Sequence, residues 1–207
     1  MIITLVGMSN IGKSHLATRL AAEAGFIRIG CDDLVESAIG DELKQLGYSG
    51  VNDVGRWMGQ PYTPAYPKNS LKFVDCERAV MLEIISELRA KKLNKPTVID
   101  TTGSVIYVGE DVVQSLKDES KIVYLEASIA HQEKLFKQYL NEPKPVIWGD
   151  SYNRLPGESE LQSLERCYPK LLAYRASCFE ALADLIIPYE FHRETQLEID
   201  LLLSSLK

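Results

Sequence analysis

The stretch Gly7-Met8-Ser9-Asn10-Ile11-Gly12-Lys13-Ser14 decides the fold of this 207-residue chain. It matches the pattern G-x-x-x-x-G-K-[ST], in which glycines let backbone N–H groups surround phosphate oxygens. The apolar run at residues 2–6 precedes it and predicts a buried strand, and residues 12–24 follow with the spacing of a helix. A chance match arises on the order of once in a hundred chains of this length, and rarer still between a strand and a helix. We therefore interpret the stretch as a Walker A loop that binds nucleotide phosphates.

The chemistry of such a loop assigns two of its side chains. Lys13 is expected to reach the β- and γ-phosphates, and the hydroxyl of Ser14 is expected to ligate Mg²⁺. The helix that follows adds the positive end of its dipole to the phosphate site. ATP and Mg²⁺ are therefore the expected ligands, with residues 7–14 as the nucleotide-binding segment.

Strand and helix patterns alternate along the rest of the chain. Strands are expected at 2–6, 26–30, 97–100, 121–125 and 184–188. Helices are expected at 12–24, 32–39, 74–92, 110–118, 128–140, 160–182 and 193–206. Two stretches rich in glycine and proline, 47–70 and 141–160, are expected to be long, mobile loops. This order predicts one α/β domain over residues 1–207, a three-layer sandwich with a parallel sheet of about five strands.

Composition excludes several classes of protein. With 23 basic and 29 acidic residues the net charge is −6, which disfavours a broad nucleic-acid-binding surface. No stretch of 18 apolar residues is present, so a membrane span is not expected, and the first residues do not resemble a signal peptide. A cytoplasmic protein is therefore expected. The histidines are scattered and are expected on the surface or in packing, and the cysteines form no C-x-x-C pair and are expected to be reduced: Cys31, Cys76, Cys167 and Cys178.

Carboxylates follow two of the predicted strands, where ligands bind in open α/β sheets. Asp100 ends one strand and is a candidate to hold Mg²⁺ through water, and Asp32 and Asp33 follow another. A carboxylate beside the γ-phosphate would accept the proton of an attacking hydroxyl. Structural roles remain open alternatives: Asp100 could cap Thr102 or Gly103, and the adjacent pair could be an N-cap and a first-turn charge.

With these residues in view, the chain resembles the shikimate kinases, within the nucleoside-monophosphate-kinase-like P-loop kinases. The resemblance covers about residues 1–188 and is carried by LVGMSNIGKSHLATRLAAEAGF, by KIVYLEASIAHQEKL and by the order of shorter motifs. It implies an ATP:alcohol phosphotransferase that transfers a phosphoryl group to a hydroxyl of a small, acidic metabolite. It also implies that segment 47–70 is an insertion on the acceptor side and that segment 141–160 is the lid.

The resemblance also implies roles for individual residues. Asp32, four residues before Glu36, matches the family's aspartate that serves the acceptor hydroxyl and Mg²⁺. Lys144 in K-P-V-I stands at the lid arginine, which makes it a catalytic candidate beside Lys13. Arg175 in R-x-x-x-F-E-A-L-A-D matches the arginine that grips the acceptor's carboxylate, and Gly103 is the surviving member of a glycine triplet on the acceptor floor.

Several positions depart from the family pattern. Gly30 stands where the family has its first aspartate, and Val74 stands where it has a second acceptor arginine. Thr101-Thr102 replaces two glycines and is expected to crowd the acceptor floor. Unless Lys72 or Arg56 completes the clamp on the acceptor, shikimate is expected to bind weakly or not at all.

The insertion carries Trp57, Tyr62 and Tyr66, which form either a collapsed loop cluster or a recognition surface for a different acceptor. The leading hypothesis is a kinase for a small hydroxyl-bearing metabolite, with a monomer or weak dimer as the expected assembly. A kinase for a sugar acid or a nucleotide is one alternative. A nucleotide-binding regulator that has lost acceptor chemistry is the other, because two acceptor-site residues of the family are missing. The sequence does not identify the acceptor.

Overall fold

The computed structural model describes residues 1–90, 95–141, 144–194 and 197–207. The strands are β1 (Ile2–Gly7), β2 (Ile27–Gly30), β3 (Thr97–Asp100), β4 (Lys121–Leu125) and β5 (Leu185–Ile187). The helices are α1 (Lys13–Ala24), α2 (Cys31–Gln45), α3 (Val51–Met58), α4 (Tyr66–Arg89), α5 (Glu110–Glu119), α6 (Ile129–Asn141), α7 (Glu160–Leu182) and α8 (Ile199–Ser205). Short helical turns lie at η1 (Val105–Tyr107), η2 (Gly149–Ser151) and η3 (Glu190–Glu194).

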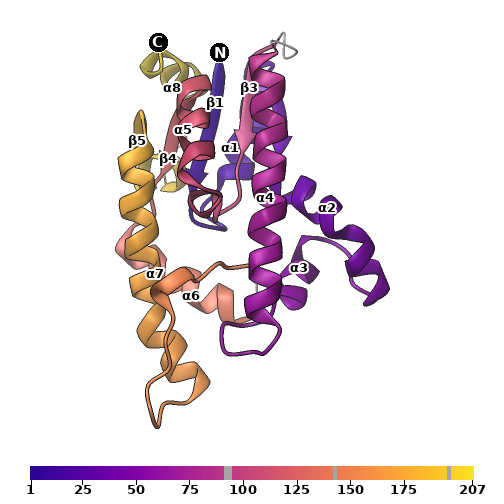
Figure 1. Cartoon of the computed structure of the whole chain (residues 1–207). Helices are drawn as coiled ribbons and strands as arrows, with labels where there is room; N and C mark the ends of the chain where they lie inside the picture. Colours follow the sequence, from indigo (N-terminus) through magenta and orange to yellow (C-terminus); the bar gives the residue numbers. More distant parts are fainter. Residues whose placement is uncertain (91–94, 142–143, 195–196) are drawn as a thin grey trace.

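The strands form one parallel sheet in the order β2-β3-β1-β4-β5, as the sequence predicts. The central strand β1 is apolar apart from Thr4, because helices cover both of its faces, and Ile3 and Leu5 have no exposed surface. In Figure 1, α5 and α7 lie in front of the sheet and α1 lies behind it. The segment at residues 7–14, which the sequence analysis interprets as a Walker A loop, joins β1 to α1. It therefore lies at the carboxyl end of the sheet, where the ends of β2 and β3 also lie.

The prediction that residues 47–70 form an irregular loop was wrong for much of the segment. The segment contains the helix α3 and the first turn of α4, which begins at Tyr66 with Pro67 in its first turn. Val54, Trp57 and Met58 are buried, at the spacing of one helical face. Trp57 therefore belongs to the packing between α3 and the rest of the molecule, as in the collapsed-cluster interpretation.

Segment 141–160 contains the turn η2 as its regular structure within the described residues. Its centre is packed inside the molecule: Val146, Ile147 and Trp148 are all buried. The hydroxyl of Tyr66 donates to the carbonyl of Val146 over 3.0 Å and accepts from the backbone N–H of Trp148 over 2.7 Å. The centre of the expected lid is therefore fastened to the first turn of α4.

Other boundaries differ from the prediction in smaller ways. The expected helix at 193–206 is divided into the π-helical turn η3 and the shorter helix α8. The helix whose start was expected at 32–39 is α2, which continues to Gln45. The last residues of the expected helix 74–92 lie outside the described residues. All four cysteines are free, as expected.

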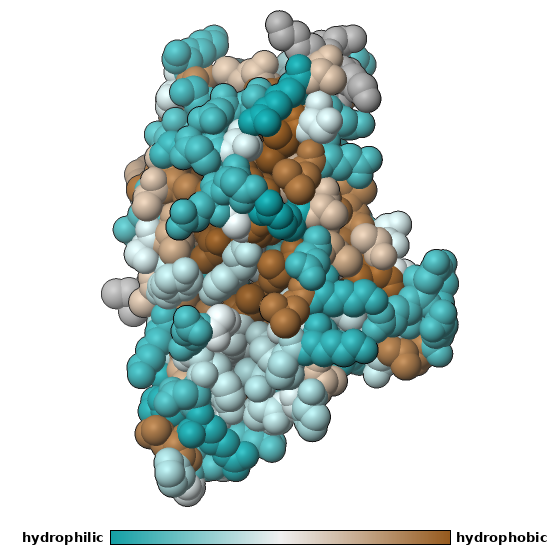
Figure 2. All heavy atoms as spheres, viewed as in Figure 1, coloured by the Kyte–Doolittle hydropathy of each residue, from teal (hydrophilic) through white to brown (hydrophobic). Residues whose placement is uncertain are grey.

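The molecular surface in Figure 2 is mixed in character. Hydrophilic side chains cover most of the projection formed by α2 and α3, and apolar side chains show in the band between α7 and α4. Among the described residues, no helix combines the length and apolar character needed to cross a bilayer.

Candidate functional site

A cleft of about 530 Å³ opens at the carboxyl end of the sheet. It collects most of the site residues that the sequence predicts, from the Walker A loop, the start of α2, the turn after β3 and the start of the expected lid. Its lining consists of Ser9, Asn10, Gly12, Lys13, Ser14, His15, Arg28, Asp32, Asp33, Phe73, Thr102, Gly103, Ser104, Gln138, Lys144 and Pro145. The predicted residues Asp100 and Arg175 lie outside this lining, as far as the structure is described.

The Walker A loop has the backbone shape that phosphate binding requires. Gly7, Asn10 and Gly12 have positive φ angles of 147°, 64° and 115°. A Cβ at Gly7 would lie 2.8 Å from the carbonyl oxygen of Leu125, so only glycine fits beside β4. The N–H groups in the first turn of α1 have no partners within the helix, which leaves them for an anion.

Lys13 is folded over the loop that precedes it. Its Nζ donates to the carbonyls of Gly7 and Met8 over 3.0 and 2.9 Å, and the residue is buried. Burial lowers the pKa of the Lys13 ammonium, and the nearby carboxylates of Asp32 and Asp100 oppose that effect. When a nucleotide binds, its phosphate oxygens would take the place of these two carbonyl oxygens as acceptors for Nζ. Charged phosphate oxygens form stronger hydrogen bonds with an ammonium group than neutral carbonyl oxygens do.

Asp32 and Asp33 lie in the first turn of α2, after the N-cap residue Gly30, and both line the cleft. Neither caps the helix with its side chain. Burial raises the pKa of the Asp32 carboxyl, and the ammonium groups of Lys13 and Lys144 counteract part of that rise. A carboxylate with a raised pKa, held beside the phosphate loop, is suited to accept a proton.

Asp100 is buried at the end of β3 and is engaged by a residue that the sequence analysis did not single out. Its Oδ2 accepts from Nε and Nη2 of Arg28 over 3.2 and 2.7 Å. The described hydrogen bonds include none from Thr102 or Gly103 to this carboxylate, so the capping alternative is not observed. Asp100 is therefore linked to the cleft by its ion pair with Arg28, which lines it.

The turn after β3 is hydrogen-bonded to the buried carboxylate of Glu77. Glu77 of α4 has no exposed surface and accepts hydrogen bonds from the hydroxyls of Thr102 and, over 2.7 Å, Ser104. Burial raises the pKa of the Glu77 carboxyl to about 7, against the effect of these two hydrogen bonds. Thr101 points away and donates to the carbonyl of Leu5, so of the two threonines expected to crowd the floor only Thr102 lines the cleft.

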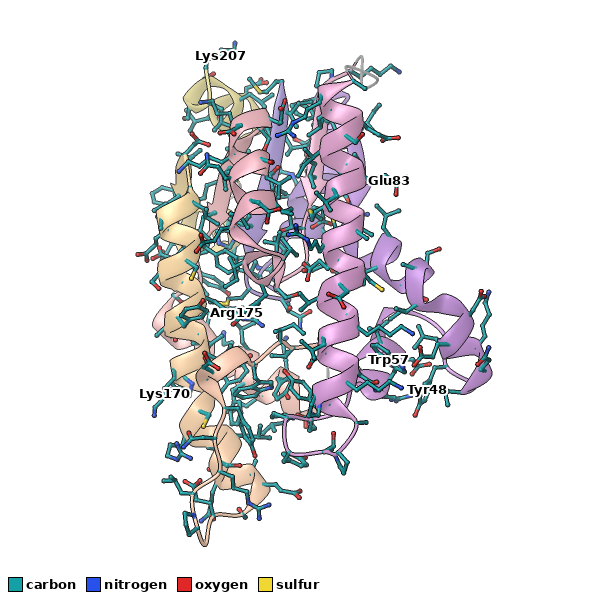
Figure 3. The ribbon with its side chains drawn as sticks, viewed as in Figure 1. Tyr48, Trp57, Glu83, Lys170, Arg175 and Lys207 are labelled. Atoms are coloured by element: carbon teal, nitrogen blue, oxygen red, sulfur yellow. The ribbon has the colours of Figure 1, made fainter. Side chains whose placement is uncertain are left out.

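Arg175 is buried and connects two separate backbone segments through hydrogen bonds. It extends from α7 and is labelled in Figure 3. Its Nη1 donates to the carbonyl of Gly103 over 2.9 Å and its Nη2 to that of Ile147 over 2.7 Å, and the residue is 3% exposed. The guanidinium also lies 5.5 Å from the ring centre of Tyr107. Binding an acceptor carboxylate through Nη1 or Nη2 of Arg175 would require these backbone hydrogen bonds to be given up, whereas its buried Nε has no hydrogen-bond partner among the described residues.

The other candidates for an acceptor clamp lie elsewhere. Lys72 forms an ion pair with Glu42, and Arg56 forms one with Asp53 over 2.9 Å. Neither residue lines the cleft within the described structure, and Val74 is a half-buried apolar residue packed on the core. The clamp that the family builds around Val74 is therefore absent from this part of the molecule.

The sequence analysis missed several residues that line or flank the cleft, among them three with long polar side chains. Arg28 and Gln138 line the cleft, and Arg193 of η3 lies over the phosphate loop, with Nη1 3.1 Å from where a Cβ at Gly12 would be. Arg28 sits in a predicted strand and Arg193 in a predicted helix, with no motif around either. Contact with the phosphate loop depends on distant segments of the chain coming together, so local patterns could not reveal it.

The donors around the loop fit a nucleotide-borne Mg²⁺. Among the described residues, no group of three or more His, Cys, Asp or Glu side chains could hold a metal ion by itself. Mg²⁺ usually keeps several waters and takes one or two protein oxygens together with substrate phosphates. Ser14 and Asp32, both in the lining, supply oxygens of that kind.

Comparison with known proteins identifies the fold. No protein-family model matches the sequence, and no curated protein matches it. Solved structures do match over nearly the whole chain. The shikimate kinase of Acinetobacter baumannii, in complex with shikimate, has a TM-score of 0.61 at 19% identity and covers 99% of this chain and 90% of its own. The shikimate kinase of Bacteroides thetaiotaomicron has a TM-score of 0.60 at 17% identity and covers 100% and 96%.

A third shikimate kinase, from Aquifex aeolicus, has a TM-score of 0.58 at 16% identity and covers 100% of this chain and 96% of its own. The fold is therefore the P-loop kinase α/β fold. More narrowly, it is shikimate kinase-like, which confirms the resemblance drawn from the sequence. At these identities the likeness defines the fold, and the reaction must be argued from the site.

Proposed function

We propose that this protein is an ATP- and Mg²⁺-dependent kinase that phosphorylates a hydroxyl group of a small, acidic metabolite. One observation carries the proposal: a single cleft holds the Walker A lysine, a partly buried carboxylate and a second lysine from another segment. These residues are Lys13, Asp32 and Lys144. A site that only stores a nucleotide needs the phosphate loop but does not need a base beside it.

The reaction would proceed by in-line displacement. The acceptor's hydroxyl oxygen forms a bond to the γ-phosphorus as the bond from that phosphorus to the β,γ-bridging oxygen breaks, and ADP leaves. The hydroxyl proton passes to the carboxylate of Asp32, which lies in the cleft beside the phosphate loop. Mg²⁺, held with the nucleotide by Ser14 and Asp32, would supply positive charge to the phosphate oxygens.

Two lysines would stabilise the charge that develops on the transferred group. Lys13 is a compact point charge at the phosphate loop, and Lys144 lines the cleft from the segment that covers it. The packing of Val146 and Trp148 around the hydroxyl of Tyr66 holds that segment in place over the site. A cover of this kind excludes water, which would otherwise compete with the acceptor for the phosphoryl group.

The names of the structural neighbours make shikimate the first acceptor to test. This chain lacks an arginine at Val74 and an aspartate at Gly30, so we expect a shikimate KM well above that of an ordinary shikimate kinase, or no turnover. A related hydroxy acid or a sugar acid is the proposed acceptor in that case.

The test is a coupled assay of ADP formation with MgATP and a panel of small hydroxy acids, sugar acids and nucleoside monophosphates. The proposal expects at least one compound to raise the rate of ADP formation well above the rate with water alone, with a phosphorylated product visible by mass spectrometry. MgATP binding without an acceptor that accelerates turnover would overturn the proposal and favour a nucleotide-binding regulator.

A further inference from the structure

Arg28 is a cation inside the cleft that neither the sequence motifs nor the family resemblance assigns to a function. It lies on β2, lines the cleft, and its side chain is 34% exposed. Its Nε and Nη2 both donate to Oδ2 of Asp100, and the described residues offer no partner for Nη1. The guanidinium is thus held by Asp100 through Nε and Nη2, while its Nη1 is available to donate to a ligand.

The strand register explains this position. In the parallel pairing of β2 with β3, Arg28 lies opposite Val98 and Gly30 lies opposite Asp100. Side chains alternate between the two faces of a strand, so Arg28, Gly30 and Asp100 share one face. The arginine therefore reaches along its own strand toward the carboxyl end of the sheet, where the neighbouring strand presents the carboxylate.

Gly30 leaves the space that the arginine uses. A Cβ at Gly30 would lie 2.8 Å from Oδ2 of Asp33 and 3.4 Å from Nη2 of Arg28. The φ angle of Gly30 is −91°, which any residue can adopt, so the backbone does not require glycine here. Because Gly30 has no side chain, the guanidinium of Arg28 and the carboxylate of Asp33 can lie together over the end of β2.

The remaining cations near the cleft have other partners or lie at its nucleotide side, where Arg193 extends over Gly12 of the phosphate loop. Arg175 donates to two backbone carbonyls, and Lys13 belongs to the phosphate loop. Lys144 enters from the covering segment, within electrostatic reach of Asp32. Arg28 is the arginine whose guanidinium is both anchored and exposed on the sheet side of the cleft.

We infer that Arg28 binds the anionic group of the phosphoryl acceptor, and that this group is a carboxylate. The inference rests on the proposed kinase function and specifies the substrate class of the same site. The cleft lining also holds Lys13 and Lys144, which the proposed function assigns to the nucleotide's phosphates. With these two lysines engaged, the acceptor would face Arg28, whose charge is balanced by Asp100, and the carboxylates of Asp32 and Asp33. A singly charged carboxylate is repelled less by this surrounding than a doubly charged phosphate monoester. Asp100 is a positioning residue that holds the guanidinium, and Asp33 is placed to accept hydrogen bonds from the acceptor's other hydroxyls.

The test compares acceptors that differ in their anionic group. ADP formation is measured with shikimate, D-glycerate and D-gluconate, with the neutral compounds methyl shikimate, glycerol and D-glucose, and with D-glucose 6-phosphate. The variants are Arg28→Gln, Arg28→Lys and the control Arg78→Gln. Arg78 is matched to Arg28 because it also pairs with an aspartate, Asp111, and is 37% exposed, but it lies outside the lining of the cleft in the described structure.

A charge-assisted hydrogen bond has a strength that corresponds to about 10- to 150-fold in affinity. We expect Arg28→Gln to lower kcat/KM for the preferred carboxylate acceptor by that factor, chiefly through KM, and to leave the KM for MgATP within about twofold. Arg28→Lys should retain part of the activity because it keeps the charge but not the bidentate geometry. It also keeps a partner for Asp100, so it serves if the glutamine variant fails to fold. Arg78→Gln should leave the acceptor preference unchanged.

Each other outcome is decisive. A preference for neutral acceptors or for D-glucose 6-phosphate, or a carboxylate preference that survives both Arg28 variants, would overturn the inference while leaving the kinase proposal in place. If no compound gives turnover, the kinase proposal fails. Binding of the three acids to the MgADP-loaded protein by saturation-transfer NMR then decides about Arg28: binding lost in Arg28→Gln supports its role, and binding that is absent or unchanged contradicts it.

Discussion

Replacing Glu77 by glutamine should change how the stability of this protein depends on pH. Glu77 is fully buried beneath the turn after β3, and its pKa is raised from 4.5 to about 7 because burial disfavours the charged carboxylate. The folded protein therefore binds a proton at this site more tightly than the unfolded chain. The stability that Glu77 contributes is greatest below pH 4.5 and is lost as the pH rises toward 7.

The structure gives the size of the effect. The two pKa values differ by about 2.5, and 1.36 kcal/mol per pKa unit makes the total loss about 3 kcal/mol. Integrating the two titrations places most of that loss, about 2–3 kcal/mol, between pH 5 and pH 8, with little further change above pH 8. Glutamine is neutral at every pH and keeps a carbonyl oxygen as acceptor for one of the two hydroxyls, while its NH2 group would face the oxygen of the other, because Thr102 and Ser104 bond different carboxyl oxygens of Glu77. The Glu77→Gln variant should therefore gain stability relative to the parent as the pH rises.

The assay is urea unfolding of both proteins, without nucleotide, at intervals from pH 5 to pH 8. Other titrating groups are common to parent and variant, so the difference in unfolding free energy isolates the buried carboxyl. Glu83→Gln is the control, because Glu83 lies on the same helix with its side chain exposed (Figure 3). A difference between parent and Glu77→Gln that stays constant within about 0.5 kcal/mol across this range would refute the reasoning.

Further substitutions test the proposed base and the contact between Tyr66 and the segment at Val146 and Trp148. Asp32→Asn should lower kcat with the best acceptor by about 100-fold or more, in the range for positioned bases, whereas Asp33→Asn should lower kcat much less. Steady-state kinetics in which Asp33→Asn has the larger effect would contradict the assignment of Asp32 as the base. Tyr66→Phe should destabilise the fold by about 1–3 kcal/mol in urea unfolding, because the buried backbone groups of Val146 and Trp148 lose their partner. An unfolding free energy equal to the parent's would show that the segment at Val146 and Trp148 is not held by this hydroxyl.

The sheet and the phosphate loop were predictable because their signals are local. A continuous apolar run predicts a strand covered on both faces, and the spacing within residues 7–14 has a direct mechanical meaning. The helix α3 was missed because glycines at 50, 55 and 59 suggested a loop and concealed the helical spacing of Val54, Trp57 and Met58. The burial of these side chains against the rest of the molecule outweighs the low helix propensity of the glycine inside the helix.

The candidate site was predictable only where one segment carries its own signal. Asp32 follows a strand and lies in the cleft, as expected, but the pairing of Arg28 with Asp100 depends on the register between two strands that are about 70 positions apart. For Arg175 the motif gives a residue type, whereas its partners come from the turn at Gly103 and from the segment at Ile147. Sequence reasoning therefore located the cleft but did not reveal that Arg28 lines it, and the role of Arg175 stays a prediction.

The central claim, phosphoryl transfer at the Walker A loop, is tested most directly by comparing acceptor-dependent ADP formation in the parent and in Lys13→Ala. Lys170→Ala, which removes an exposed lysine of α7 (Figure 3), serves as the control. Loss of a preorganised charge at the transferred group costs about 3–4 kcal/mol, so the rate should fall by about 150- to 1,000-fold in Lys13→Ala alone. ADP formation at the parent rate in Lys13→Ala, with the fold intact, would contradict the account.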